Sequence, residues 1–329
     1  MIHAFLEYKA MNVSIRLLKS HELDAADHIF RLAFGTFVGL PEPTEFYGDA
    51  TYIPHRWKSD PTTVFVAEAD GKLIGSNLAV NWGSFGFFGP LSVHPDYWNQ
   101  GIGQKLVEPA IASFEQWNHR LDGLFTFAQS SKHHALYQKF GFRLQFLTAI
   151  MAKSVQPNQV PTQLQVLPGE TQYSQINPEQ RLECLRACRE VTESVYEGLN
   201  LSREIQTVQA QGLGDTLLLW DESNLAGFAV CHCGAATEAG SDTCFIKFAA
   251  VRCGSNAAEN FEKLLDLCEA LTVVRGMSKL VAGINTSRDD AYCRMLARGF
   301  RPEIIGVAMQ KPNQQGYNRP DVFAIDDWR

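Results

Sequence analysis

Apolar and polar residues follow one another along the first half of the chain in patterns that predict alternating strands and helices. Within 22–33, apolar residues recur at three- and four-residue spacing, which is the period of a helix packed on one face. A strand is expected before it at 14–18, and two apolar runs joined by Asp70-Gly71 predict a hairpin over 63–80. The elements expected next are a strand at 84–93, a helix after Gly103, a strand at 121–128, a helix at 131–140 and one or two strands at 142–151. This order predicts an α/β layer around a mixed sheet.

The same order of elements returns in the second half. The matching segments are a hairpin at 217–231, a strand at 245–254, a helix from Phe261 to Leu271, a strand at 280–285 and a closing strand at 305–309. A tandem duplication accounts for this repeat, with one fold in each half. We therefore predict a domain over 12–153, a linker rich in Gln, Pro, Val and Thr over 154–175, and a second domain over 176–329.

Two irregular segments are candidates for function or docking. Residues 34–60 contain several glycines and prolines without clear periodicity, which is typical of a binding loop. Its aromatic residues are Phe34, Phe37, Phe46, Tyr52 and Trp57. They predict either an apolar pocket for a substrate or packing of the loop on its own domain, and both interpretations stay open. Residues 317–329 are too aromatic for a free tail and are expected to dock on a domain.

Composition narrows the class of protein. A length of 329 residues fits two domains, and 45% hydrophobic with 20% charged residues is typical of a globular protein. The net charge of −7 gives no electrostatic reason to expect nucleic acid as a partner. The sequence has no apolar run long enough for a membrane span and no secretory signal pattern at its start, so we predict no membrane partner and a cytoplasmic location.

The cysteines do not predict a metal site. All eight lie in the second half, and only Cys231-His232-Cys233 is closely spaced. In a strand, residues 231 and 233 would share one face while His232 pointed to the other. A zinc site usually needs a second pair of ligands nearby, and the sequence offers none. We expect buried thiols and no metal.

Glycines at 101 and 103 mark the most informative turn of the chain, because they follow an apolar strand and open a helix. Without side chains there, the first free amides of the helix can point at an anion, and the helix dipole favours negative charge at that end. The turn therefore predicts a pyrophosphate site. A dinucleotide-binding site is the obvious competitor, but its glycines would follow the first strand of a parallel unit rather than about the fourth strand.

Two segments in this order, Trp98-Asn99-Gln100-Gly101-Ile102-Gly103 and Tyr137-Gln138-Lys139-Phe140-Gly141-Phe142, resemble the GNAT superfamily of N-acetyltransferases. The resemblance is strong over 12–152 and fainter over 180–310. It implies two GNAT-like domains, each a mixed, mostly antiparallel sheet flanked by helices. It also implies acetyl-CoA as the co-substrate, with its pantetheine along residues 91–93 and its pyrophosphate over the turn. The implied cofactor-binding residues are Leu91, Val93, Gln100, Gly101, Gly103, Gln104, Lys105 and Ser130. The family has Arg or Gln where this chain has Trp98.

The resemblance assigns catalysis to Tyr137, which would protonate the leaving thiolate; packing of an amphipathic aromatic residue is the alternative. Many relatives carry a glutamate on the strand before the glycine turn, but residues 84–91 contain no carboxylate. Candidate bases are Glu42, Glu45, Asp49 and His94, or a chain of water molecules. The second half has Gly254-Ser255-Asn256 at its turn and Met295 at the position of Tyr137, so we expect a degenerate copy there.

We therefore predict an acetyl-CoA-dependent N-acetyltransferase in which an amine attacks the thioester directly, without a covalent enzyme intermediate. Positioning of the two substrates would supply most of the rate. The alternative is a non-catalytic acyl-CoA-binding protein that serves as a regulator or sensor. A cleft between two domains favours a small-molecule amine as the acceptor, although an amino acid, an aminoglycoside-like antibiotic and a protein terminus are also compatible with the sequence. The sequence assigns no oligomeric state.

Overall fold

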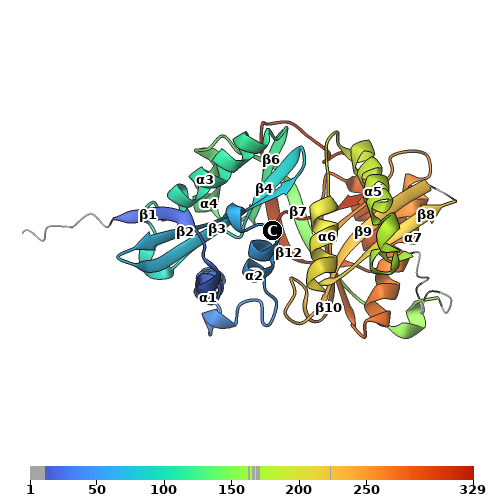
Figure 1. Cartoon of the computed structure of the whole chain (residues 1–329), viewed down its shortest axis with the longest axis horizontal. Helices are drawn as coiled ribbons and strands as arrows, with labels where there is room; N and C mark the ends of the chain where they lie inside the picture. The colour runs from blue at the N-terminus through green and yellow to red at the C-terminus, as the bar shows by residue number, and fades with distance from the viewer. Residues whose placement is uncertain (1–11, 162–163, 165–166, 168–170, 223) are drawn as a thin grey trace, which may run out of the picture.

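The strands of both halves join in one continuous sheet in the computed structural model, which describes residues 12–161, 164, 167, 171–222 and 224–329 (Figure 1). In the first half the strands are β1 (Val13–Leu17), β2 (Val64–Ala69), β3 (Lys72–Trp82), β4 (Phe85–Phe88), β5 (Ser92–Val93), β6 (Leu121–Phe127) and β7 (Arg143–Ser154). In the second half they are β8 (Gly214–Asp221), β9 (Asn224–Gly234), β10 (Gly240–Val251), β11 (Lys279–Asn285), β12 (Arg301–Lys311) and β13 (Ala324–Ile325). Most neighbours are antiparallel, and β4 with β6 and β10 with β11 are parallel.

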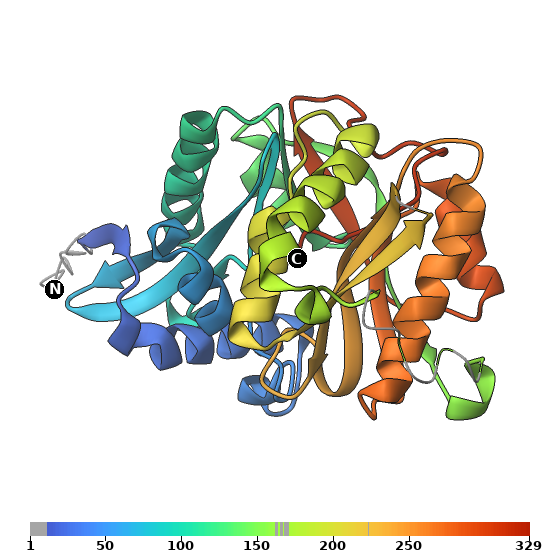
Figure 2. The same cartoon turned by 45° about the vertical axis from the view of Figure 1, so that its right-hand side comes forward.

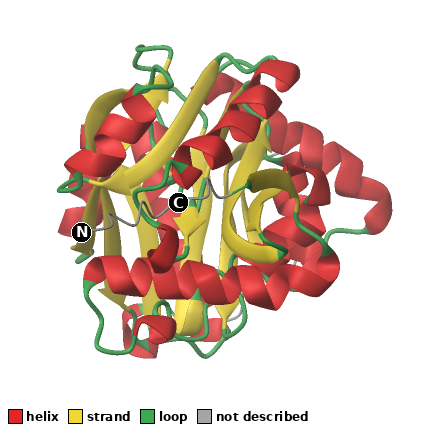
Figure 3. Ribbon diagram, turned by 90° about the vertical axis from the view of Figure 1, so that its left-hand side faces the viewer, coloured by secondary structure: helices red, strands yellow, loops and turns green. Residues whose placement is uncertain are grey.

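Helices lie on either side of the strands (Figures 2 and 3). They are α1 (Leu23–Val38), α2 (Ile53–Ser59), α3 (Ile102–Trp117), α4 (Ser131–Gln138), α5 (Arg181–Val195), α6 (Ser202–Gln211), α7 (Ala257–Val274) and α8 (Asp289–Ala297). The apolar stripe of α3, which includes Leu106, Ala110 and Phe114, packs on β2 and β3 in the core of the first half. The apolar stripe of α7 packs on β9 and β10 in the same way. The predicted α/β architecture with a mostly antiparallel sheet is confirmed.

Two element boundaries differ from the sequence prediction for local reasons. Helix α1 continues past residue 33 to Val38, and it ends where Gly39 adopts a left-handed φ of +78°. The strand expected over 84–93 is broken into β4 and β5 at Gly89-Pro90. Gly89 has a φ of +147°, and proline has no amide hydrogen to donate to a ladder. The break separates β5 from the parallel neighbour of β4.

The closing strands of the two halves are exchanged. The central order is β6-β12-β7-β11, so β12 pairs with β6 of the first half and β7 pairs with β11 of the second. β7 and β12 also pair with each other. The predicted boundaries at 12–153, 154–175 and 176–329 thus remain a division of the sequence, because each half completes its sheet with a strand from the other.

The segment after β12 docks on the molecule, as its aromatic content led us to expect. Strand β13 pairs with β10 through Ala249–Ile325 and Ala250–Ala324. The chain then runs to the centre of the molecule, between the two halves (Figure 1). Trp328 is buried there and its ring contacts Phe85 of β4, with 4.8 Å between ring centroids.

Candidate functional site

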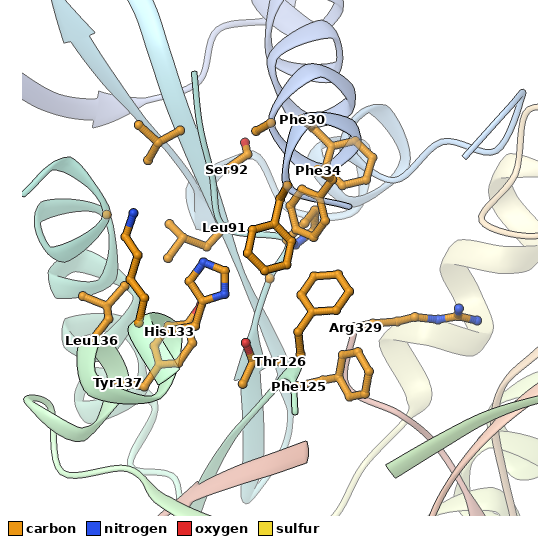
Figure 4. A pocket seen from close by; sticks show the side chains of 18 of the residues that line it. Phe30, Phe34, Leu91, Ser92, Phe125, Thr126, His133, Leu136, Tyr137 and Arg329 are labelled. Atoms are coloured by element: carbon orange, nitrogen blue, oxygen red, sulfur yellow. The ribbon is translucent and has the colours of Figure 1, made fainter. Parts of the chain in front are cut away.

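A large cavity of about 1130 Å³ lies beside the break between β4 and β5. Its walls come from α1, the loop after it, residues 88–93, the start of α3, β6 and α4, with further residues from β12 and the last two positions of the chain. Figure 4 shows Tyr137 and His133 on one side of this space and Phe30, Phe34 and Phe125 on the other. Segments far apart in the sequence thus build one site.

The glycine turn forms one end of the cavity. Gly101 caps α3 with a left-handed φ of +78°, and a Cβ added there would meet no atom within 4 Å. The first amide bonded within the helix is that of Lys105, which donates to the Gly101 carbonyl at 3.3 Å. The amides of residues 102–104 precede it and are the free donors of a helix N-terminus. A Cβ on Gly103 would meet only Leu136, at 3.5 Å, so both glycines leave room for a ligand.

The strand edge next to the turn is shaped by Trp98, which lines the cavity. Its indole Nε1 donates to the carbonyl of Val93 at 2.6 Å, so this residue closes the end of β5 instead of presenting the polar side chain expected at its position. The ammonium of Lys132 lies 5.7 Å from the centre of the Trp98 ring. Lys132 therefore brings a positive charge to the cavity near the free amides.

Tyr137 projects from α4 and is 7% exposed. Its ring packs against Phe88 of β4, with 5.7 Å between centroids, and its side chain borders the cavity. Burial raises the pKa of the phenol above its usual value, so the group keeps its proton at neutral pH. Burial is the one cause of this shift, and no hydrogen bond to the hydroxyl contributes to it.

The other end of the cavity is aromatic. Phe34, Phe37, Phe46 and Tyr52 all line it, together with Phe30 and Phe127. The rings contact one another, as in Phe37 against Phe127 with 4.9 Å between centroids. Trp57 instead packs away from the cavity and donates from its indole to the carbonyl of Leu18 at 3.0 Å. Four of the five aromatic residues singled out in the sequence thus both pack on the domain and form a pocket.

Comparison with known proteins identifies the domain that holds this cavity. The family model described as "Acetyltransferase (GNAT) family" matches residues 26–142. Residues 26–142 belong to the GNAT acetyltransferase family. The match contains the glycine turn and Tyr137, and it supports acyl transfer as the chemistry of this GNAT domain. No curated protein sequence matches the chain.

Solved structures extend the likeness to both halves. A putative acetyltransferase from Pyrococcus horikoshii superposes with a TM-score of 0.66 at 15% identity, over 100% of this chain and 98% of that one. A GCN5-related N-acetyltransferase from Sphaerobacter thermophilus gives a TM-score of 0.59 at 16% identity, over 91% of this chain and 95% of that one. At such identities the likeness shows the fold alone, and the predicted GNAT fold is confirmed.

The GNAT domain brings most of the sequence-predicted residues to the cavity. Leu91, Val93, Gly101, Gly103, Gln104 and Tyr137 line it, whereas Gln100, Lys105 and Ser130 do not. Gln100 donates to the carbonyl of Asp96 at 3.2 Å, and Lys105 is exposed on α3. Ser130 caps α4 by accepting a hydrogen bond from the His133 amide. The contacts of these three residues with a cofactor stay predictions.

None of the four candidate bases borders the cavity. Asp49 accepts hydrogen bonds from the amide and hydroxyl of Ser241, which hold the pKa of its carboxyl below the usual value. The imidazole of His94 accepts from the Asp96 amide at 3.3 Å. Glu42 and Glu45 also lie outside the residues that line the space. A base, if a side chain supplies it, must come from elsewhere.

Among the lining residues that the sequence analysis did not single out are Lys132, His133, Trp328 and Arg329. His133 could have been found, because it precedes Tyr137 by four residues and shares its face of α4. Local spacing could not have identified Trp328 and Arg329, because only the docking of the tail brings them to the GNAT domain. Arg329 runs along the edge of the cavity, and its guanidinium turns away to lie 4.3 Å over the ring of Phe245 (Figure 4).

Metal and membrane sites have no counterpart in the described residues. No three potential metal-ligating side chains gather anywhere in this part of the chain. The thiols of Cys233 and Cys244 contact each other at 3.7 Å between adjacent strands, and His232 accepts from the Glu238 amide. Over the same residues, the helices are all too short or too polar to cross a bilayer.

Proposed function

We propose that this protein is an acetyl-CoA-dependent N-acetyltransferase in which an amine acceptor attacks the thioester directly. One observation carries the proposal: a single cavity of the GNAT domain joins the free amides after Gly101, the hydroxyl of Tyr137 and an aromatic chamber. The first would bind an anionic cofactor, the second would supply a proton, and the third would receive the acceptor. Each function therefore has a residue at the appropriate wall.

The glycine turn fits the pyrophosphate of acetyl-CoA. The open space above Gly101 and Gly103 admits a phosphate to the amides, and the positive end of the α3 dipole favours its charge. Lys132 adds a cation at the same wall. Among the described residues β5 pairs only with β3, and the carbonyl of Val93 accepts from Trp98, so the other backbone groups on the cavity edge of 91–93 would be available to the pantetheine arm. This is the arrangement expected of a co-substrate that supplies an activated acetyl group.

Tyr137 would act as the general acid. Its protonated phenol borders the cavity, and donation of that proton to the departing thiolate would prevent the thiolate from attacking the new amide bond. Backbone amides near Val93 would polarise the thioester carbonyl. The remaining contribution is positional, because the cavity walls hold the amine and the thioester together.

The aromatic chamber supports a small amine with an apolar body as the acceptor. Glu303 is the one carboxylate side chain among the described residues that line the cavity, and it already pairs with Lys279 at 2.8 Å. A polycationic acceptor such as an aminoglycoside would therefore find no free counter-charge. Apolar and aromatic surface, by contrast, is buried favourably among Phe34, Phe37 and Phe127.

Calorimetry with acetyl-CoA, followed by a thiol-release assay over a panel of amines, tests this function. We expect one binding site per chain and faster thiol release with arylalkylamines than with polyamines. Gly101→Ala should weaken binding about tenfold or more, because its methyl group enters the space for the phosphates. Gly39→Ala is the matched control, since Gly39 has the same φ of +78° and equally open surroundings but does not line the cavity.

Two results would reject the proposal in different ways. Absence of binding at millimolar acetyl-CoA would remove the case for this co-substrate. Tight binding without thiol release over the whole panel would favour the alternative of a non-catalytic sensor. Equal binding by the Gly101→Ala and Gly39→Ala variants would show that the ligand binds elsewhere.

A further inference from the structure

We propose that His133 is the general base that takes the proton from the attacking amine. The inference rests on the proposed acetyl transfer and assigns the one role that the expected carboxylates leave vacant. A neutral amine must lose a proton during or after its attack on the thioester, so a group with a free lone pair has to stand at the acceptor side of the cavity.

The position of His133 meets this requirement. It lies on α4 four residues before Tyr137, so both side chains project from one face of the helix toward the same space (Figure 4). The imidazole packs against Phe37 of α1, with 5.0 Å between ring centroids, and so stands between Tyr137 and the aromatic chamber. An acceptor seated in that chamber would approach the thioester past this ring.

The imidazole of His133 is also unengaged. The neighbouring His134 bonds its Nε2 to the carbonyl of Phe127 at 3.1 Å, whereas the ring of His133 has no hydrogen-bond partner in the part of the chain that the structure describes. His133 is half-buried, and its ring nitrogens are not among the fully buried side-chain atoms that lack a partner, so they are open to the cavity. A bound amine could therefore reach the imidazole.

Other titratable groups that line the cavity are unsuited to accept a proton. Lys132, Lys139 and Arg329 are cations, and the tyrosines at 47, 52, 97 and 137 are proton donors near neutral pH. Glu303 is exposed and paired with Lys279. His133 is thus the remaining lining side chain, among the described residues, with a lone pair available for the amine.

The surroundings keep this imidazole neutral. Burial lowers the pKa of His133 below its usual value, and the charges of Lys132 and His134 on the same helix lower it further. The element packed against its ring, α1, presents the uncharged Phe37, and no carboxylate contributes to the shift. At pH 7 the group is therefore in the deprotonated form that a base requires.

The step balances with the groups present. The amine nitrogen bonds to the thioester carbonyl carbon, and its proton passes to the free nitrogen of His133. Collapse of the tetrahedral adduct breaks the carbon–sulfur bond, and the Tyr137 hydroxyl protonates the thiolate. Solvent then takes the proton of the imidazolium and restores that of the tyrosine.

The test compares His133→Gln with His134→Gln in the full-length protein, using acetyl-CoA and an arylamine that is uncharged over the pH range studied. With such an amine, an acidic limb in kcat/KM reports a group of the enzyme. We expect wild type to lose activity as the pH falls below the usual histidine range, because the base becomes protonated. His133→Gln should lower kcat/KM by about 10²–10⁴-fold and abolish that limb. His134→Gln should retain both activity and limb.

Calorimetric binding of acetyl-CoA with wild-type affinity would show that the His133→Gln variant is folded. Added imidazole should partly restore turnover to His133→Ala, which a purely structural role would not allow. If wild type turns over but His133→Gln keeps its rate and its acidic limb, the assignment of His133 is wrong while acetyl transfer stands. If wild type binds acetyl-CoA yet acetylates no amine, the proposed acetyltransferase function is wrong, and the assignment of His133 as its base is rejected as well.

Discussion

The two halves of the molecule carry the same pair of diverging parallel strands, but the two pairs have different neighbours where the strands separate. In the first half, β4 pairs with β6 over Phe85–Phe87. The strand is then interrupted at Gly89-Pro90, where the cavity begins. In the second half, β10 and β11 pair over Thr243–Ile246 and then separate. There the free edge of β10 is taken by β13 from the chain's own last segment. One cleft is open to a ligand and the other is filled by protein.

The filling is well packed. The amide of Val251 donates to the carbonyl of Phe323 at 3.2 Å, which extends the ladder between β10 and the tail. The ring of Phe323 lies 5.5 Å from that of Phe261 on α7, where a cofactor would pass in the open half. A duplicated cleft can thus be closed to a ligand while the fold is kept, because a β-strand satisfies the same backbone edge.

The filled half also serves the open one. Arg288 and Asp326 form a fully buried ion pair at 2.7 Å, and the hydroxyl of Tyr317 donates to the same carboxylate at 2.8 Å. The indole of Trp328 donates to the oxygen of Tyr317 at 3.0 Å. These bonds fix the tail so that Trp328 reaches the wall of the first cavity. The second half thus shapes a site whose cofactor turn it does not contain.

The largest effect that separates the halves concerns Tyr137 and its counterpart. Tyr137→Phe should lower turnover by about 10²-fold or more, because the leaving thiolate loses its proton donor, while acetyl-CoA affinity is retained. Met295→Leu is the matched change in the second half, where the side chain is buried in the core, and it should leave turnover unaffected. Steady-state kinetics with calorimetry measures both. Unchanged turnover in Tyr137→Phe would contradict the acid role and make the two positions equivalent.

The next effect concerns the buried ion pair between Arg288 and Asp326, which holds the tail in the filled cleft. Arg288→Met should lower the free energy of unfolding by about 3–5 kcal/mol, because it leaves the carboxylate of Asp326 buried without its charge partner. Arg186→Met removes the exposed pair with Glu183 and should cost about 0–1 kcal/mol. Urea denaturation of the two variants gives the difference. Similar midpoints would mean that the tail contributes little to the second half.

A smaller effect compares the two glycine turns. Gly254 has a φ of +155° and open space around its Cβ position, so its surroundings are as roomy as those of Gly101. We expect Gly101→Leu to weaken acetyl-CoA binding strongly and Gly254→Leu to leave it within about twofold, since the second cleft is filled. Calorimetry should give one site per chain in wild type. A second site that is lost on substitution of Gly254 would overturn the comparison.

The smallest expected effect is on stability at acid pH, and it concerns the ion pair of Arg16 and Glu22 beside β1 in the first half. Hydrogen bonds from Arg16 lower the pKa of Glu22 to about 2. A carboxyl whose pKa is depressed in the folded state stabilises it above the unfolded pKa of about 4.3, and this contribution is lost as the pH falls toward 2. Glu22→Gln should therefore flatten the acid limb of stability slightly, by less than about 1 kcal/mol because the pair is partly exposed. An unchanged limb in thermal melts between these pH values would contradict the assignment.

Local patterns predicted the elements and the cofactor end of the site. The helical spacing of α3, the hairpin turn at Asp70-Gly71 and the glycines before the helix are short-range signals, since each depends on backbone preferences within a few residues. The general base was not found in this way. The sequence offered Glu42, Glu45, Asp49, His94 or a chain of water molecules as the base. The proposed role of His133 instead depends on its position against the ring of Phe37 across the cavity.

The amino-acid sequence alone predicted a repeated α/β unit and a glycine turn that opens a helix at residues 101–103, and it places Tyr137 in the first half where the second half has Met295. Long-range packing set the remaining features: β7 and β12 are exchanged between the two halves of the sheet, β13 fills the second cleft and Trp328 reaches the first. The physical reason is that strand edges and apolar faces specify what kind of partner they need but not which distant segment supplies it. That choice is made by the packing of the whole chain.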